Sequence, residues 1–529
     1  MFRKLVTLGG AAVALTALTG PTWAIGLPVP AANVIFVSGS TALDNAWKHF
    51  MILSGVSPCT AGTIDTYEDN NKSNPYKSSN LYTIIACTSN QAIGSIASGQ
   101  PVAFVKESSG GSLEGTTPVS LHTTLKFLDP TAAGGPVGCA AAVAGTVYSV
   151  AHDLAFTDHT ACTGPVNSFG PNVGLADENP TVFTLGQNKA TNVVISNLTT
   201  NLMFQNPFGI GVSLNLYRAL QVQQGLSGTV ACPVNSDTLA CMPDMSSMAV
   251  RSTMSQFLGS GSWASLHGLP APPSANNQVF VCRRGDTSGT QAAADIYLFN
   301  GRCQVTDNEN PNNPAAMTFA QATTTAANCA NLPAGETPED FGCTWAAVNV
   351  NDTVFPGTGT GDVAKCLAAH DTNGTYAIGV IATNNAFGHV NGAAGAGDYR
   401  MTALDGAHPT TQSQANGTYH FAMDNVVNVA KNGTSAAKAY QTLLATKLGT
   451  NTAVLGDIIS TQVGDANYGV GGLFDILTTG SQPALPATLA GVQANPTSAG
   501  TQLSDGATQN DCVKVTPNGN VVMTQDPNN

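Results

Sequence analysis

Short apolar runs that lead into a polar turn and then into a helical pattern recur along the chain. In NVIFVSGSTALDNAWKHFMILSG, which starts at Asn33, a β-rich run is followed by a Ser/Gly/Thr turn, after which apolar residues return at helical spacing. The same order occurs in PVAFVKESSGGSLEG from Pro101, NPFGIGVSLNLYRALQ from Asn206 and VCRRGDTSGTQAAADIYLFN from Val281. Units of strand, turn and helix build α/β folds, so the pattern predicts an α/β protein.

Between these units the chain is rich in turn residues. Residues 54–80 and 304–360 contain many turn-forming residues, so we expect the first to be a surface insertion and the second to be another insertion or a long loop. TYAIGVIAT, from Thr375, predicts another strand, and SAAKAYQTLLATKL, from Ser435, another helix. Residues 481–529 have the composition of a loosely structured tail.

The first 24 residues have the layout of a secretory signal peptide. Arg3 and Lys4 precede an apolar run from Leu5 to Leu18, and small residues follow up to Ala24. Pro21 interrupts the run too early for a membrane anchor. We therefore expect residues 1–24 to be removed and the mature protein to reach the periplasm or the extracellular space.

The twelve cysteines agree with an exported protein, because an even number in an oxidising compartment favours disulfide bonds. No Cys-x-x-Cys or Cys/His zinc spacing occurs, so no metal or other cofactor is expected. Nearest neighbours suggest four pairs: Cys59–Cys87, Cys139–Cys162, Cys232–Cys241 and Cys329–Cys343.

The charge balance excludes nucleic acid as a partner. The chain has a formal net charge of −13, and loss of Arg3 and Lys4 would leave 17 basic and 32 acidic residues. Such a field repels polyanions at long range. A small anion could still bind, if local hydrogen bonds and dipoles hold it.

Three of the predicted turns have the chemistry to hold a small anion. They are SGSTA at 38–42, SSGG at 108–111 and DTSGT at 286–290. Helix N-termini present unpaired N–H groups and the positive end of the helix dipole, which attract anions. Ser and Thr at such places are also ordinary N-caps. Arg284 beside the third turn strengthens the anion interpretation, because its guanidinium can bind two oxygens at once, and Asp286 could orient it.

These residues resemble the periplasmic phosphate-binding proteins of ABC transporters, including the DING-type relatives. The signature Arg-x-Asp-x-Ser-Gly-Thr of that family is present in full from Arg284 to Thr290. The resemblance implies a two-lobe α/β periplasmic binding protein fold (type 2) with loop insertions and a ligand cleft between the lobes. It also implies a ligand set, which comprises the Thr41 hydroxyl, the Ala42 amide, Ser108, Asp158, Arg284, Ser288, Gly289 and Thr290, with Ser40, Ser109, Gly110 and Asp286 in support.

Asp158, in AFTDHTA, would select between anions. An ionised aspartate only accepts hydrogen bonds, so it favours an oxyanion that carries a proton, such as hydrogen phosphate, and repels sulfate. Arsenate has the same protons and is not distinguished. A surface or capping aspartate is the alternative interpretation of this residue.

Further matches to the family indicate where the boundaries of the two lobes are expected. Gly259 and Trp263 match a helix, glycine and Trp segment, and YAIGV matches the strand on which the chain returns to its first lobe. Lys106 and Glu107 depart from the family, which has small or apolar residues there. The expected divisions are 25–205 for the first part of lobe one, 206–374 for lobe two, 375–480 for the return to lobe one, and 481–529 for the tail.

The sequence therefore predicts an exported binding protein that captures inorganic phosphate as a monomer, for uptake through an ABC transporter permease, and that is not an enzyme. His152 and His159 lack a third ligand for a metal, and no Gly-x-Ser-x-Gly or His-Glu-x-x-His motif occurs. Two alternatives remain open: a secreted or surface protein that binds a partner or matrix through its loops, and a phosphatase-type enzyme of DING association.

Overall fold

The computed structural model describes residues 27–449 with gaps, together with two short strands near the C-terminus. The larger gaps are 70–81, 133–146, 184–193, 300–353 and 384–397. The expected signal peptide, Ser109, Gly110, Asp158, Gly259 and most of the 304–360 insertion lie outside the described residues. No helix within the described ranges is long and apolar enough to cross a membrane.

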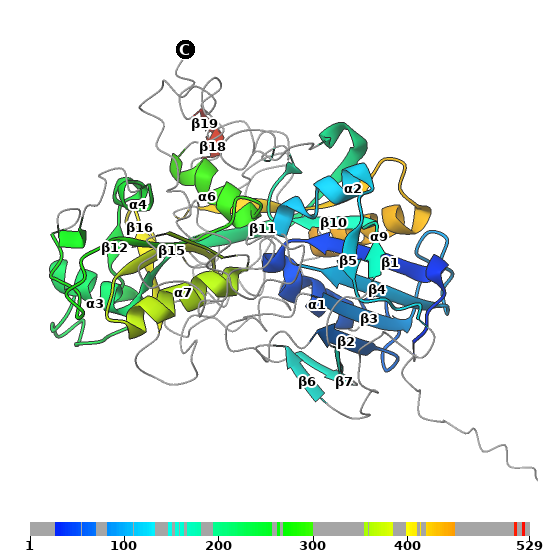
Figure 1. Cartoon of the computed structure of the whole chain (residues 1–529), viewed down its shortest axis with the longest axis horizontal. Coiled ribbons are helices and arrows are strands. Elements are labelled where there is room, and N and C mark those ends of the chain that lie inside the picture. Colours follow the sequence, from blue (N-terminus) through cyan, green and yellow to red (C-terminus); the bar gives the residue numbers. More distant parts are fainter. Residues whose placement is uncertain are drawn as a thin grey trace, which may run out of the picture.

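Thirteen of the described strands build one mixed sheet that runs through two halves of the molecule (Figure 1), and the pairs β5–β9, β6–β7 and β18–β19 form separate two-stranded sheets. The main path has the order β14-β13-β15-β11-β17-β10-β1-β4-β3-β2-β8. In the first half, β1 (Val34–Gly39) lies between β10 (Val173–Ala176) and β4 (Pro101–Glu107), and both pairs are parallel. In the second half, β13 (Phe280–Arg284) runs parallel to its two neighbours, β14 (Val354–Gly357) and β15 (Ala377–Ala382). The α/β fold expected from the sequence is confirmed.

Two long strands join the halves. The N-terminal part of β11 (Leu198–Ser213) pairs with β17 (Ala422–Ala430), and its C-terminal part pairs with β15 and with β16 (Tyr399–Leu404). On its other edge β17 pairs with β10 of the first half. The chain thus returns to the first half on β17, later than the expected position near residue 375, because β15 is held between β13 and β11 in the second half.

The remaining elements complete the two halves. The first half contains β2 (Asp65–Asp69), β3 (Tyr82–Thr88), β5 (Leu125–Phe127), β6 (Val147–Val150), β7 (Leu154–Thr157), β8 (His159–Cys162), β9 (Asn167–Phe169), α1 (Asp44–Ile52), α2 (Thr117–Leu121) and α9 (Ser435–Gly449). The second half contains β12 (Asp244–Met245), α3 (Leu214–Gln223), α4 (Ser247–Met254), α6 (Gly289–Phe299) and α7 (Thr360–Thr372), and β18 (Val513–Val515) pairs with β19 (Val521–Met523). Because β2 pairs with β3 and β8 in the main sheet, residues 54–80 are not wholly a surface insertion.

Separate cores stabilise the halves. In the first, the Trp47 indole N–H donates to the hydroxyl of Tyr440 over 2.8 Å, which ties α9 to α1 although almost 400 residues separate them. In the second, the fully buried Trp263 donates to the carbonyl of Tyr376 over 3.1 Å. Each core is dominated by buried apolar side chains, whose removal from water is the main favourable term in folding.

Three disulfides are present among the described residues. Cys59–Cys87 and Cys232–Cys241 confirm two of the expected pairs. Cys282–Cys366 was not expected, and it joins β13 to α7 across 84 residues of sequence. Cys162 is also disulfide-bonded, whereas Cys139, Cys329 and Cys343 lie outside the described residues.

Candidate anion-binding site

The first predicted turn follows the carboxyl end of β1. Gly39 has a φ of 104°, and a Cβ there would lie 2.1 Å from the carbonyl oxygen of Leu175, so only glycine fits. The Ser40 hydroxyl accepts a hydrogen bond from the Ala42 amide over 3.2 Å, and a short 3₁₀ turn (Thr41–Leu43) then leads into α1. Ala42 packs against the core of the second half, so this turn lies where the halves meet.

The third predicted turn brings the N-terminus of α6 to the same place. Ser288 and Thr290 are buried, with exposed fractions of 2% and 0%. A Cβ on Gly289 would lie 2.3 Å from the Ser112 hydroxyl and 2.7 Å from Cβ of Asp177. Glycine at this position therefore allows the end of α6 to approach the first half closely.

Asp177 is the carboxylate at which these elements meet. It directly follows β10, is 2% exposed, and accepts hydrogen bonds from the Ser40 hydroxyl and, over 3.4 Å, from the Thr290 hydroxyl. Its own amide donates to the Ser112 hydroxyl over 2.9 Å. One side chain thus joins the turn after β1 to the start of α6.

Burial and local charges act on Asp177 in opposite directions. Burial raises the pKa of this carboxyl, whereas hydrogen bonds from Ser40, the charge of Arg284 and hydrogen bonds from Ser112 and Thr290 lower it, and the net direction is upward. A raised pKa favours a proton at this position. The group is therefore suited to share a proton with a neighbouring acid.

Arg284 supplies positive charge from the second half. It is 2% exposed, and it donates from Nε to the Gly357 carbonyl and from Nη1 to the Thr360 hydroxyl, each over 3.2 Å. Burial lowers the pKa of Arg284 to about 10, against the opposing effect of Asp177 and Asp362. The guanidinium is thus charged at neutral pH.

Asp286 forms its ion pair with Arg283, although we expected it to orient Arg284. Arg283 is 3% exposed, and its Nε also donates to the Arg284 carbonyl over 2.9 Å. Successive side chains of a strand point to opposite faces, so neighbouring arginines of β13 diverge. Arg283 lies near the buried carboxyl of Asp295 as well, and its role within this part of the structure is to hold the turn.

Two hydroxyls at the predicted turns are buried without a hydrogen-bond partner among the described residues. They are Thr41 Oγ1 in the turn after β1 and Ser288 Oγ just before α6. Buried polar groups are nearly always satisfied, so each exception calls for an explanation. Both residues belong to the expected ligand set, and an oxyanion would accept a hydrogen bond from each.

The second predicted turn contributes a different serine from the expected one. The Ser108 hydroxyl accepts from Lys106 over 2.6 Å and donates to Asp44 over 2.8 Å, so its single proton is already used. The loop reaches Asp177 instead through Ser112, and the Leu113 amide donates to the Thr287 carbonyl of the second half over 3.0 Å.

The site contains two residues that were not predicted from the sequence. Ser40, Gly289 and Thr290 come together as expected, with Arg284 near enough to act on the pKa of Asp177. Asp177 and Ser112 were missed. A signal for Asp177 was present in VGLADENP, where a short apolar run ends on an aspartate just as the run from Val34 ends on its turn.

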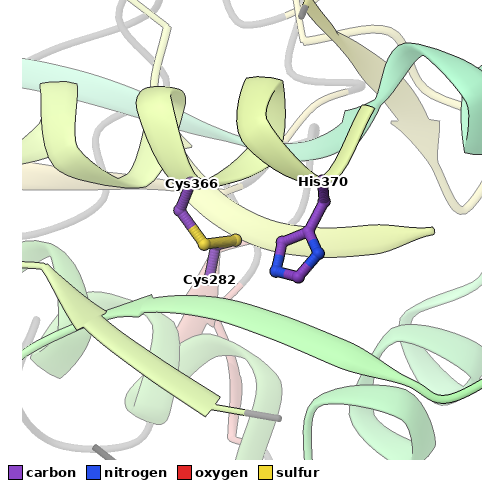
Figure 2. Close-up of side chains that lie close together, drawn as sticks. All are labelled: Cys282, Cys366 and His370. Carbon is purple, nitrogen blue, oxygen red and sulfur yellow. A yellow bond between two sulfur atoms is a disulfide. The ribbon is translucent and has the colours of Figure 1, made fainter. Parts of the chain in front are cut away.

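One cluster among the described residues, which shares β13 with Arg284, has metal-ligand chemistry. Figure 2 shows Cys282, Cys366 and His370, whose candidate ligand atoms lie within 4.8 Å of one another. The two sulfur atoms are bonded to each other, so neither is a thiolate that could bind a metal. Burial lowers the pKa of His370 to about 3, its Nδ1 lies 2.9 Å from the Thr375 hydroxyl, and its ring packs on Phe280. The cluster is therefore part of a core.

Comparisons with known proteins give similar structures only. No family model matches the chain, and neither does any curated protein. A structure from Clostridium perfringens, described as a phosphate ABC transporter substrate-binding protein with bound phosphate, is 10% identical, with a TM-score of 0.36 over 80% of this chain and 98% of its own. PstS from Borrelia burgdorferi is 8% identical, with a TM-score of 0.30 over 80% and 97% of the two chains. An ABC-type phosphate transport receptor from Vibrio cholerae is 12% identical, with a TM-score of 0.28 over 55% and 79%. At these scores the function must follow from this chain's own residues.

Proposed function

We propose that this protein is a solute-binding protein that captures inorganic phosphate between its two halves. The observation that carries the proposal is the buried carboxylate of Asp177, which hydroxyls from both halves surround and next to which Arg284 lies. A carboxylate, a guanidinium and several hydroxyls in one buried place form an acceptor and a set of donors for a protonated oxyanion.

Arg284 and the N-terminus of α6 would carry the anion's charge. The guanidinium offers planar N–H groups that match phosphate oxygens, and the first amides of α6 point toward the start of the helix. The hydroxyls of Thr41 and Ser288, which have no partner among the described residues, would each donate to a phosphate oxygen. Such donors are strong when water is excluded around them.

In this proposal Asp177, rather than Asp158, selects for a protonated oxyanion. Hydrogen phosphate can donate its proton to the carboxylate, whereas sulfate at neutral pH has no proton to offer and would place oxygen lone pairs against a negative charge. The hydroxyls of Ser40 and Thr290, which now donate to Asp177, could turn to the anion when it binds.

The same proposal covers the physiological setting. The protein would be exported, would bind phosphate as a monomer without catalysing a reaction, and would deliver it to an ABC transporter permease. The lobes would be those expected from the sequence, except that the chain returns to lobe one on β17. Closure of the lobes would bury the anion, as in other hinge-type binding proteins.

Calorimetric titration of phosphate into the oxidised protein tests the proposal. We expect saturable binding to one site, with weaker binding of sulfate, and a loss of at least tenfold in phosphate affinity for Arg284→Ala. Arg218→Ala is the matched control, because Arg218 is an arginine of the second half that pairs with Asp237. Absence of phosphate binding to the folded parent protein would contradict the proposal.

A further inference from the structure

A lysine with almost no exposure lies beneath the turn after β1. Lys106, in β4, is 1% exposed. Its ammonium group lies 2.6 Å from Asp44 Oδ1, 2.6 Å from the Ser108 hydroxyl, 3.0 Å from the Gly39 carbonyl oxygen and 3.2 Å from the Ser40 carbonyl oxygen. Four acceptors from three segments thus surround one cation.

The contacts leave this lysine no donor for a ligand. An ammonium group has three N–H donors, and four acceptors already lie within reach of them. A buried charge persists only where it is paired and hydrogen-bonded, and Asp44 provides the opposite charge. Lys106 can therefore influence a bound anion only through the groups that it holds.

Two of the groups that Lys106 holds, the carbonyls of Gly39 and Ser40, fix the orientation of the peptides in the turn. The carbonyl of Ser40 belongs to the same planar peptide as the amide of Thr41, and in a trans peptide the C=O and N–H point in opposite directions. A lysine that holds the Ser40 carbonyl therefore directs the Thr41 amide away from itself. Contact with the Gly39 carbonyl restrains the preceding peptide in the same way.

Lys106 also has an electrostatic effect on the site. Asp44 is the first residue of α1 and directly follows the turn, so its negative charge lies close to any anion bound there. With Lys106 at 2.6 Å, the pair has no net charge. Without the lysine, an uncompensated carboxylate would repel the anion.

We propose that Lys106 is a positioning residue of the anion site: it holds the carbonyls of Gly39 and Ser40, and it neutralises Asp44. This inference rests on the proposed function for its effect on phosphate affinity. The effect on the backbone of the turn does not depend on phosphate. The two parts can therefore be tested separately.

The test compares Lys106→Met with Lys48→Met. Lys48 is also a buried lysine of the first half, and its ammonium group pairs with Glu68 of β2. Both substitutions remove one buried cation. A general loss of stability would thus appear in both variants, whereas a positioning effect would appear in Lys106→Met alone.

Phosphate affinity is the first measurement. We expect Lys106→Met to bind phosphate at least tenfold more weakly, which corresponds to about 1.4 kcal/mol, and Lys48→Met to stay within twofold of the parent. The double variant Lys106→Met/Asp44→Asn removes both charges, a change that proteins often tolerate. It should bind more tightly than Lys106→Met but more weakly than the parent.

Hydrogen exchange at residues 40–43, measured without phosphate, is the second measurement. We expect faster exchange in Lys106→Met and in the double variant, and no change in Lys48→Met. If Lys106→Met does not fold, the double variant decides the outcome in its place.

The proposal would be overturned if hydrogen exchange at residues 40–43 were unchanged in Lys106→Met. It would also be overturned if Lys106→Met and Lys48→Met lost phosphate affinity equally. If the parent protein binds no phosphate, the proposed function fails, and exchange alone then decides the role of Lys106.

Discussion

Asp177→Asn removes the charge at the centre of the site while it keeps the shape of the side chain. Asp177 is buried, and it accepts hydrogen bonds from Ser40 and Thr290. In the proposed complex it would accept one hydrogen bond from protonated phosphate. A hydrogen bond to a charged group contributes about 1.5–3 kcal/mol, so we expect phosphate affinity to fall about 10- to 100-fold.

Sulfate should respond in the opposite direction. The asparagine presents no negative charge and can donate an N–H, which removes the repulsion of an unprotonated oxyanion. We expect the ratio of phosphate to sulfate affinity to fall at least tenfold, as measured by calorimetry with each anion at pH 7. Asp362→Asn is the control, because it removes another carboxylate near Arg284 that is not among the groups around Asp177.

The stability of Asp177→Asn gives an independent check. Because burial raises the pKa of Asp177 in the folded protein, its contribution to stability is greatest at low pH and is lost as the pH rises through the folded-state pKa. The variant should therefore gain in melting temperature over the parent between acidic and neutral pH. An unchanged anion ratio together with an unchanged pH profile would refute this role for Asp177.

Other contacts lead to three further predictions. Gly289→Ala places a Cβ 2.3 Å from the Ser112 hydroxyl, and we expect a loss of about 1–3 kcal/mol in unfolding free energy together with weaker phosphate binding; unchanged melting would contradict it. Replacement of both Cys282 and Cys366 by alanine opens a loop of 84 residues. From the chain-entropy model we expect the free energy of unfolding to fall by about 4–5 kcal/mol, as measured by denaturant unfolding, and an unchanged free energy would contradict this. Burial raises the pKa of Asp295 to about 7, although the charge of Arg283 lowers it. Ionisation of this group should therefore reduce the free energy of unfolding as the pH rises from about 4 to 7. Asp295→Asn should gain in melting temperature relative to the parent over that interval, and a constant difference would argue against the shift.

Local patterns predicted the parts of the site that depend on a single turn. The strand after Asn33 and the helix near Thr290 were expected to within about two residues of the bounds in the structure, since an apolar run, a Ser/Gly turn and helical spacing are contiguous in sequence. The disulfides Cys59–Cys87 and Cys232–Cys241 were likewise predictable, because their cysteines are near neighbours in the chain.

Features that depend on distant segments were not predictable in this way. Asp177 gains its place because β10 lies parallel to β1, a pairing that joins segments more than 130 residues apart. Cys366 reaches Cys282 because α7 packs on β13. Ser112, which follows β4, reaches Asp177 at the end of β10 only in the folded protein. None of these pairings leaves a periodic signal in the sequence.

A crystal structure of the oxidised protein grown with phosphate tests the central claim most directly. We predict one phosphate ion within hydrogen-bond distance of the turn after β1, Asp177, Arg284 and the first amides of α6, with the Thr41 and Ser288 hydroxyls donating to it. A phosphate bound elsewhere, or none at these residues at saturating concentration, would contradict the account.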